Sequence, residues 1–238
     1  MRALFLLLGA TAFAQQWPYW GGDPGGQKHA ALKQINKTNV AQLKPAWTFR
    51  TGDVSDGSKY IMRSAFESTP LVVDGVMYVT TPFNRVIALQ PETGEQIWAF
   101  DPKIDKTRSA NLFISRGCSY WTDGKKKRIL HGTQMGRMYS LDAATGKPDD
   151  SFGDKGSIDL RKGVADGYED RGYGVTSPPA IYKNLIITGA WASDGEPRGP
   201  AGDVRAFDVH TGKLVWTFHT IPRAGEFGND TWEGKSWE

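Results

Sequence analysis

Three side chains of different chemistry stand at the same point of the sequence pattern, directly before an apolar segment. Glu67 precedes Ser-Thr-Pro-Leu-Val-Val, Arg116 precedes Gly-Cys-Ser-Tyr-Trp, and Thr176 precedes Ser-Pro-Pro. An arginine guanidinium is a planar fork of donors that suits carboxylates or quinone oxygens. Glu67 or Arg116 taken singly reads as an ordinary loop charge. Their shared position favours a binding site built from an acid, a guanidinium and a hydroxyl.

The elements that must position these side chains are repeated along the chain. Residues 86–98 read VIALQPETGEQIW, residues 204–216 read VRAFDVHTGKLVW, and residues 138–147 read MYSLDAATGK. An apolar strand, a turn with Thr-Gly and a second apolar strand, recurring at roughly fifty- to sixty-residue spacing, are typical of propeller blades. The sequence therefore predicts an all-β fold, a β-propeller with about three blades and part of a fourth. The first strand of each blade lines the central channel, so Glu67, Arg116 and Thr176 are predicted to converge on one face.

The predicted strands follow this repeat. The first blade is expected to have four strands joined by hairpin turns, with Asp74-Gly75 as one such turn. In the second blade, the outer portion is expected to be replaced by a Gly/Asp-rich excursion at 147–172. Residues 222–237 would begin a fourth blade. The predicted strands are 70–73, 76–81, 86–89 and 96–100 in the first blade, 128–133 and 137–141 in the second, and 185–188, 204–207 and 214–218 in the third, which opens at Thr176.

Three segments outside the repeat also carry predictions. Residues 36–44 are expected to form a short helix, capped by Thr38 or Asn39 and ended before Pro45. Residues 46–50 resemble the last strand of a blade, so we expect them to complete the final blade of the ring, leaving Trp47 without strand partners in this chain. The basic run 125–128 follows Asp123-Gly124 and is expected to be a solvent-exposed hairpin loop.

The composition fits a packed β domain and excludes several classes of protein. The chain has 238 residues, nine tryptophans and a formal net charge of +3, which favours a solvated surface over a nucleic-acid footprint. Residues 1–14 resemble a signal peptide cleaved before Gln15, too short to span a bilayer, so the mature chain 15–238 is expected in the periplasm or outside the cell. Cys118 is the only cysteine, which excludes an internal disulfide.

Several motifs together resemble the pyrroloquinoline quinone (PQQ) dependent dehydrogenases, whose propellers have eight blades. They are Trp20-Gly-Gly-Asp near the N-terminus, the segments that start at Glu67, Arg116 and Thr176, and Gly202-Asp-Val-Arg-Ala-Phe-Asp. The segment 222–233, PRAGEFGNDTWE, looks most like the glucose and polyol dehydrogenase branch. The resemblance covers nearly all residues after the signal.

The resemblance implies roles for particular residues. Glu67, Arg116 and Thr176 would hold the quinone cofactor, and Asp194 would be an acidic calcium ligand, although an Asp-Gly pair by itself suits a turn. A sugar or alcohol would be oxidised by hydride transfer to the cofactor. The family's catalytic base is expected beyond Glu238. No C-x-x-C-H haem motif occurs, so a separate acceptor, the quinone pool or a cytochrome c, is implied.

The chain also departs from that family's pattern. Ala110 and Asn111 stand in the stretch where methanol- and ethanol-type members carry adjacent cysteines, and Trp191 stands where a serine is expected. Two alternatives to a dehydrogenase are a non-catalytic propeller scaffold or binding protein of the cell envelope, and a propeller hydrolase. The hydrolase needs paired carboxylates, and only Glu67 is a candidate. We expect the chain to be the N-terminal part of a longer protein, and residues 15–238 alone to aggregate and to lack dehydrogenase activity.

Overall fold

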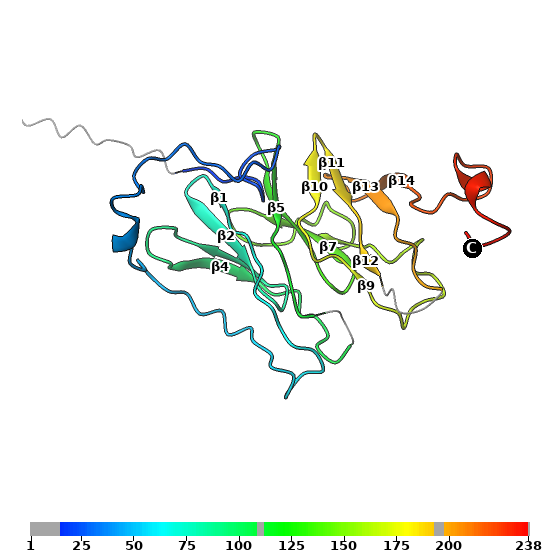
Figure 1. Cartoon of the computed structure of the whole chain (residues 1–238), viewed down its shortest axis with the longest axis horizontal. Helices are drawn as coiled ribbons and strands as arrows, with labels where there is room; N and C mark the ends of the chain where they lie inside the picture. Colours follow the sequence, from blue (N-terminus) through cyan, green and yellow to red (C-terminus); the bar gives the residue numbers. More distant parts are fainter. Residues whose placement is uncertain (1–14, 109–111, 193–197, 238) are drawn as a thin grey trace, which may run out of the picture.

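The computed structural model describes residues 15–108, 112–192 and 198–237, and nearly all of its regular structure is antiparallel sheet. Three four-stranded sheets follow one another along the chain and across the molecule (Figure 1). Each sheet is one blade, and together they form an open part of a propeller. The strands are β1 (Leu71–Val73), β2 (Val76–Thr80), β3 (Val86–Leu89) and β4 (Gln96–Phe100) in blade 1; β5 (Ser119–Thr122), β6 (Lys127–Gly132), β7 (Arg137–Asp142) and β8 (Ser157–Asp159) in blade 2; and β10 (Ala180–Tyr182), β11 (Leu185–Thr188), β13 (Val204–Asp208) and β14 (Leu214–Phe218) in blade 3.

The remaining elements are short. A two-stranded sheet pairs β9 (Tyr173–Gly174) with β12 (Trp191–Ala192). The two 3-10 turns are η1 (Val40–Gln42) and η2 (Asn229–Thr231). In the part of the chain that the structure describes, no helix has the length and apolar character needed to cross a membrane.

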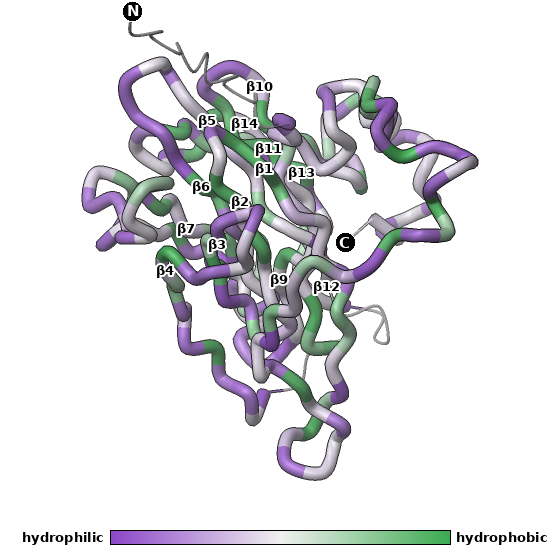
Figure 2. Tube along the Cα trace, turned by 90° about the vertical axis from the view of Figure 1, so that its left-hand side faces the viewer, coloured by the Kyte–Doolittle hydropathy of each residue, from purple (hydrophilic) through white to green (hydrophobic). Residues whose placement is uncertain are grey.

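Apolar residues are buried where neighbouring blades pack together, and the strands are greener than the outer loops in Figure 2. One cluster between blades 1 and 2 includes Leu71, Trp98 and Leu141. A second cluster between blades 2 and 3 includes Met138, Phe152 and Ile186. Since a single sheet cannot bury both of its faces, each blade packs on its neighbour, and these two clusters hold the three blades together.

The first joint, between blades 1 and 2, is built on the Thr-Gly turn of blade 2. The Trp98 ring lies on Gly146, where a Cβ atom would stand 2.4 Å from Trp98 Cε3. Gly146 also has φ of +70°, so any other residue would be strained there. Trp98 Nε1 donates to the Ala143 carbonyl at 3.1 Å, and the Tyr78 hydroxyl donates to the same oxygen at 3.1 Å.

The second joint, between blades 2 and 3, uses different side chains at the matching position. The Thr-Gly turn of blade 3 ends at Gly212, whose Cβ position would meet Ile158 and Phe152. The carbonyl of Val209 accepts a hydrogen bond from the Arg128 guanidinium, which also pairs with Asp149. Arg128 is 1% exposed, so this joint contains a fully buried cation.

Three predictions about the fold need correction. Blade 2 keeps its outer strand: the excursion at 147–172 contains β8, which pairs with β7. The basic run at 125–128 is not all solvent-exposed loop, because Lys127 and Arg128 lie in β6 and Arg128 is buried against its acidic partner. The helix predicted at 36–44 is only the 3-10 turn η1, because local hydrogen bonds of Asn36 and Asn39 take its place.

The segment 46–50 forms no strand in the described structure, and its expected place in the final blade of the ring stays a prediction. The Trp47 side chain is not left without a partner. Its ring lies on Gly94, and its Nε1 donates to the Pro91 carbonyl at 2.9 Å. Trp47 therefore packs on the turn of blade 1 as Trp98 packs on the turn of blade 2.

Candidate functional site

The starts of the three blades are connected by backbone hydrogen bonds. The Thr69 amide donates to the Arg116 carbonyl at 3.1 Å, and the Arg116 amide donates to the Thr176 carbonyl at 2.8 Å. Each of these residues lies two to four residues before β1, β5 or β10. The segments that carry the predicted site residues therefore lie side by side because the first strands of successive blades are neighbours.

The side chains of Glu67, Arg116 and Thr176 meet at this place. Arg116 Nε lies 3.0 Å from Glu67 Oε2, and Arg116 Nη1 donates to Thr176 Oγ1 at 2.8 Å. The Arg116 and Glu67 side chains are 41% and 44% exposed, so the cluster is open to solvent. A guanidinium has five N–H donors; one of them is donated to Thr176, and the Glu67 carboxylate forms an ion pair on the Nε side. The structure thus brings the three predicted residues together and leaves Arg116 with donors for a ligand.

A network of hydroxyl groups, which the sequence did not predict, lies next to the cluster. Thr80 Oγ1 donates to Ser68 Oγ at 3.1 Å, and Ser115 Oγ donates to Thr80 Oγ1 at 2.9 Å. Ser68 follows Glu67 and Ser115 precedes Arg116, so the network connects the two segments that carry the ion pair. The signal in the sequence was a serine beside each charged residue, which is too common to single out.

Gly117 allows the close packing beside Arg116. It has φ of +139°, a conformation that favours glycine, and a Cβ there would lie 3.2 Å from the Thr69 carbonyl oxygen. The same position would lie 3.3 Å from Pro178 Cγ. A side chain at 117 would therefore push apart the starts of blades 1, 2 and 3.

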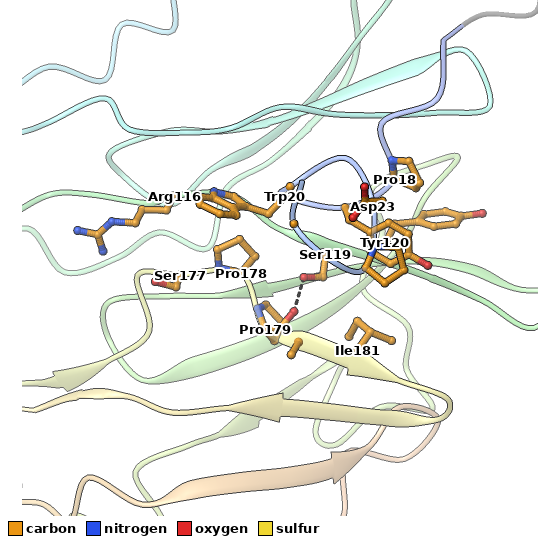
Figure 3. Close-up of a pocket in the computed structure, with 15 residues that line it drawn as sticks. Pro18, Trp20, Asp23, Arg116, Ser119, Tyr120, Ser177, Pro178, Pro179 and Ile181 are labelled. Atoms are coloured by element: carbon orange, nitrogen blue, oxygen red, sulfur yellow. Dashed lines mark hydrogen bonds between the residues drawn. The ribbon is translucent and has the colours of Figure 1, made fainter. Parts of the chain in front are cut away.

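A groove of about 420 Å³ begins at Arg116 and runs between the N-terminal segment, β5 and β10 (Figure 3). Aromatic and proline side chains form most of its walls, and Arg116, Ser177 and Asp23 contribute polar groups. In Figure 3, the Arg116 guanidinium lies at one end of the groove, on the side of Ser177 and away from Tyr120. The lining residues include Pro18, Trp20, Tyr120, Pro178, Pro179 and Ile181.

Two buried titratable side chains near the cluster are neutral at physiological pH. Burial raises the pKa of the Cys118 thiol to about 12, so this thiol is not a nucleophile at neutral pH. Burial lowers the pKa of His131 to about 4, and its Nε2 donates to the Asn84 carbonyl at 2.9 Å. The charge at this place therefore comes from Arg116 and Glu67.

The predicted metal ligand Asp194 lies outside the described residues, as do Ala110 and Asn111. Within the described ranges, no group of three or more His, Cys, Asp and Glu side chains is placed to hold a metal ion. Trp191 is in β12, opposite Gly174. It also borders a second hollow of about 520 Å³ that Thr176 and Thr188 line.

Residues 17–238 match the sequence profile of the PQQ family described as the glucose/ethanol/alcohol dehydrogenase β-propeller domain. The chain belongs to this family. It is 31% identical over 223 residues to quinoprotein glucose dehydrogenase A of Acinetobacter calcoaceticus, a match that covers 86% of this chain and 28% of that protein. It is 37% identical over 209 residues to the dehydrogenase subunit of alcohol dehydrogenase (quinone) of Gluconobacter oxydans (strain 621H), covering 87% of this chain and 25% of that protein.

The fold agrees with the family membership. The crystal structure of quinohemoprotein alcohol dehydrogenase from Comamonas testosteroni superposes with a TM-score of 0.69 at 29% identity, over 87% of this chain and 28% of that chain. The relatives are quinoprotein glucose and alcohol dehydrogenases, and the matches confirm the predicted family and the β-propeller fold. The chain spans about a quarter of the length of these relatives.

Proposed function

We propose that this chain forms part of a periplasmic quinoprotein dehydrogenase that oxidises a sugar or an alcohol with calcium-bound PQQ. The observation that supports this most directly is the placement of Arg116 between Glu67 and Thr176. Family membership supports the reaction class, and residues 1–14, which resemble a signal peptide, support export. The geometry is what separates this proposal from a scaffold, because a scaffold has no need of an open ion pair at the blade starts.

The chemistry of this donor set fits an oxygen-rich quinone. Glu67 holds the Nε side of the Arg116 fork and Thr176 holds Nη1, so the plane of the guanidinium is fixed by two partners. A fixed planar fork pairs well with carboxylate or quinone oxygens. Arg116 would bind the ortho-quinone edge of PQQ, while Glu67 and Thr176 would orient Arg116 and contact the ligand from either side.

Bound PQQ would supply the hydride acceptor, and the residues of this chain would bind and orient it. Asp194 would provide a carboxylate oxygen to a calcium ion, a hard cation that prefers oxygen ligands. The electron acceptor would be a separate partner, the quinone pool or a cytochrome c.

The test removes the guanidinium in the full-length protein. Arg116→Ala should weaken PQQ binding by roughly ten- to a hundredfold, since a hydrogen bond to a charged group contributes about 1.5–3 kcal/mol. Arg116→Lys should recover only part of this, because an ammonium keeps the charge without the fork. PQQ affinity is measured by calorimetry, and dye reduction is measured with glucose or ethanol in the presence of calcium.

A matched control is Arg85→Lys, since Arg85 also pairs with a carboxylate, Asp53, at 2.8 Å but lies outside the cluster. It should leave PQQ affinity unchanged. Equal affinity in wild type and Arg116→Ala would place the cofactor elsewhere. A full-length protein that binds no PQQ would support the alternative of a non-catalytic scaffold or binding protein.

A further inference from the structure

The N-terminal segment 17–28 lies along the inner edge of blade 1. The Trp17 amide donates to the Val72 carbonyl at 2.7 Å, and the Val72 amide donates back to the Trp17 carbonyl at 3.0 Å. Gln16 Oε1 accepts from the Asp74 amide at 3.1 Å. The segment is therefore joined at Trp17 to β1, the first strand of the blade that follows Glu67 (Figure 1).

The same segment then folds into a closed loop. The Lys28 amide donates to the Gly21 carbonyl at 2.7 Å, which brings the two ends of the loop together. The Trp17 ring packs on Gly22, whose Cβ position would be 2.8 Å from Trp17 Cη2. The loop is thus a compact unit anchored to blade 1. Residues that contact the loop are therefore held at a fixed position relative to β1.

The Trp20 side chain extends from this loop to the starts of blades 2 and 3. Its Cδ1 lies 4.0 Å from the Cβ position of Gly117, the residue after Arg116. Trp20, Arg116 and Pro178 line the same groove, and Figure 3 shows the Trp20 indole beside the Arg116 side chain and next to Pro178. Lys28 Nζ lies 4.0 Å from the centroid of the Trp20 ring, a cation–π contact that restricts the ring.

We propose that Trp20 is a positioning residue for Arg116, and that segment 17–28 braces the blade starts from which Glu67, Arg116 and Thr176 project. The side chains of Arg116 and Glu67 are 41% and 44% exposed, so burial alone does not fix their positions. The backbone bonds from Thr69 to Arg116 and from Arg116 to Thr176 are the connections that the brace would stabilise. Its effect on the cofactor rests on the function proposed above.

The experiment compares Trp20→Ala and Trp20→Phe with wild type in the full-length protein. The first readout is amide hydrogen exchange without cofactor, which does not depend on the proposed function. Exchange at Thr69 and Arg116 should become roughly tenfold faster in Trp20→Ala, because local opening requires only the loss of these contacts. Exchange in β3 should not change, and Trp20→Phe should stay near wild type.

The second readout is PQQ affinity, which should fall roughly tenfold in Trp20→Ala through the misplaced guanidinium and recover in Trp20→Phe. Tyr182→Ala is the matched control, since Tyr182 is also exposed and has Lys183 Nζ 5.3 Å from its ring centroid. It should change neither readout.

Unchanged exchange at Thr69 and Arg116 would overturn the proposal, as would equally faster exchange in β3, which would mean general destabilisation. Local exchange that rises while PQQ affinity stays constant would overturn the link to the cofactor. Should wild type itself bind no PQQ, the proposed function fails, and the exchange readout still decides whether Trp20 positions Arg116.

Discussion

The two joints between blades each pair a backbone carbonyl of a Thr-Gly turn with a donor from the preceding blade, but one donor is neutral and the other is charged. In both, the turn before Thr-Gly presents a backbone carbonyl to the preceding blade, that of Ala143 in the first joint and that of Val209 in the second. A neutral indole, Trp98, donates to the first carbonyl, and the buried guanidinium of Arg128 donates to the second. A buried cation is stable only with a partner, and Asp149 supplies it. The first joint therefore depends on shape, and the second depends on an ionised carboxylate.

Trp98→Ala should have the largest effect, because it removes the side chain that fills the first joint. Truncating a buried tryptophan commonly costs about 3–5 kcal/mol of unfolding free energy through lost transfer energy and the cavity left behind. Urea unfolding of the variant and wild type at several pH values measures this. The difference should be the same at pH 4 and pH 7, and a strongly pH-dependent difference would contradict a joint based on shape. Trp232→Ala, at a partly exposed tryptophan outside both joints, is the control.

Asp149→Ala should cost about 3 kcal/mol at pH 7, the lower end for a broken buried pair, since Asp149 is partly exposed. Burial raises the pKa of Asp149, but hydrogen bonds from Ser151 and the charge of Arg128 outweigh this, so the pKa lies below its ordinary value of 3.8. The stabilisation is present above pH 3.8 and is lost as the pH falls through the lowered pKa.

The cost of Asp149→Ala should accordingly shrink below about pH 4, where wild type also loses the charge. Asp150→Ala is the matched control, since the adjacent carboxylate is exposed. A cost that stays constant down to pH 2 would show that Asp149 acts by packing and not by charge.

His131 gives the contact between blades 1 and 2 a pH dependence of its own, in a range above that of Asp149. It lies in β6 of blade 2 and donates to Asn84 of blade 1, and its pKa falls from 6.5 to about 4. As the pH falls, the unfolded chain takes up this proton before the folded chain does. The free energy of unfolding is therefore undiminished above pH 6.5 and decreases toward pH 4, by up to about 3 kcal/mol. His131→Gln should flatten the unfolding free energy between pH 6.5 and 4, whereas His29→Gln, at an exposed histidine, should not. An unchanged slope in His131→Gln would mean that another group titrates there.

The sequence predicted the first joint better than the second for a physical reason. Trp98 closes a repeat that is visible in the sequence, and β1–β4 follow the predicted strands to within a residue. Arg128 belongs to a run of basic residues, and its partners Asp149 and Val209 lie 21 and 81 residues away. Nothing local marks such a residue as buried. Likewise β8 has only three residues with no clear alternation, so its place in blade 2 is set by pairing with β7.

The candidate site shows the same division. The position of Glu67, Arg116 and Thr176 relative to the blades was readable because the repeat fixes the phase of each strand. Their cofactor-binding role stays a prediction, as does that of Asp194. The contribution of Trp20 was not readable, because it depends on a loop that returns across Gly117 from a distant part of the chain.

The separation of partners along the chain sets the order in which the two joints can close. Trp98 and Ala143 are 45 residues apart, whereas Arg128 and Val209 are 81 residues apart. The entropy of loop closure makes the longer connection more costly by only about 0.5 kcal/mol. Order of synthesis matters more, because a chain emerging from a ribosome folds from its N-terminal end. The first joint can close before the turn at Val209 has been made, and until then Arg128 lacks the Val209 carbonyl and has Asp149 and Ser151 as its partners.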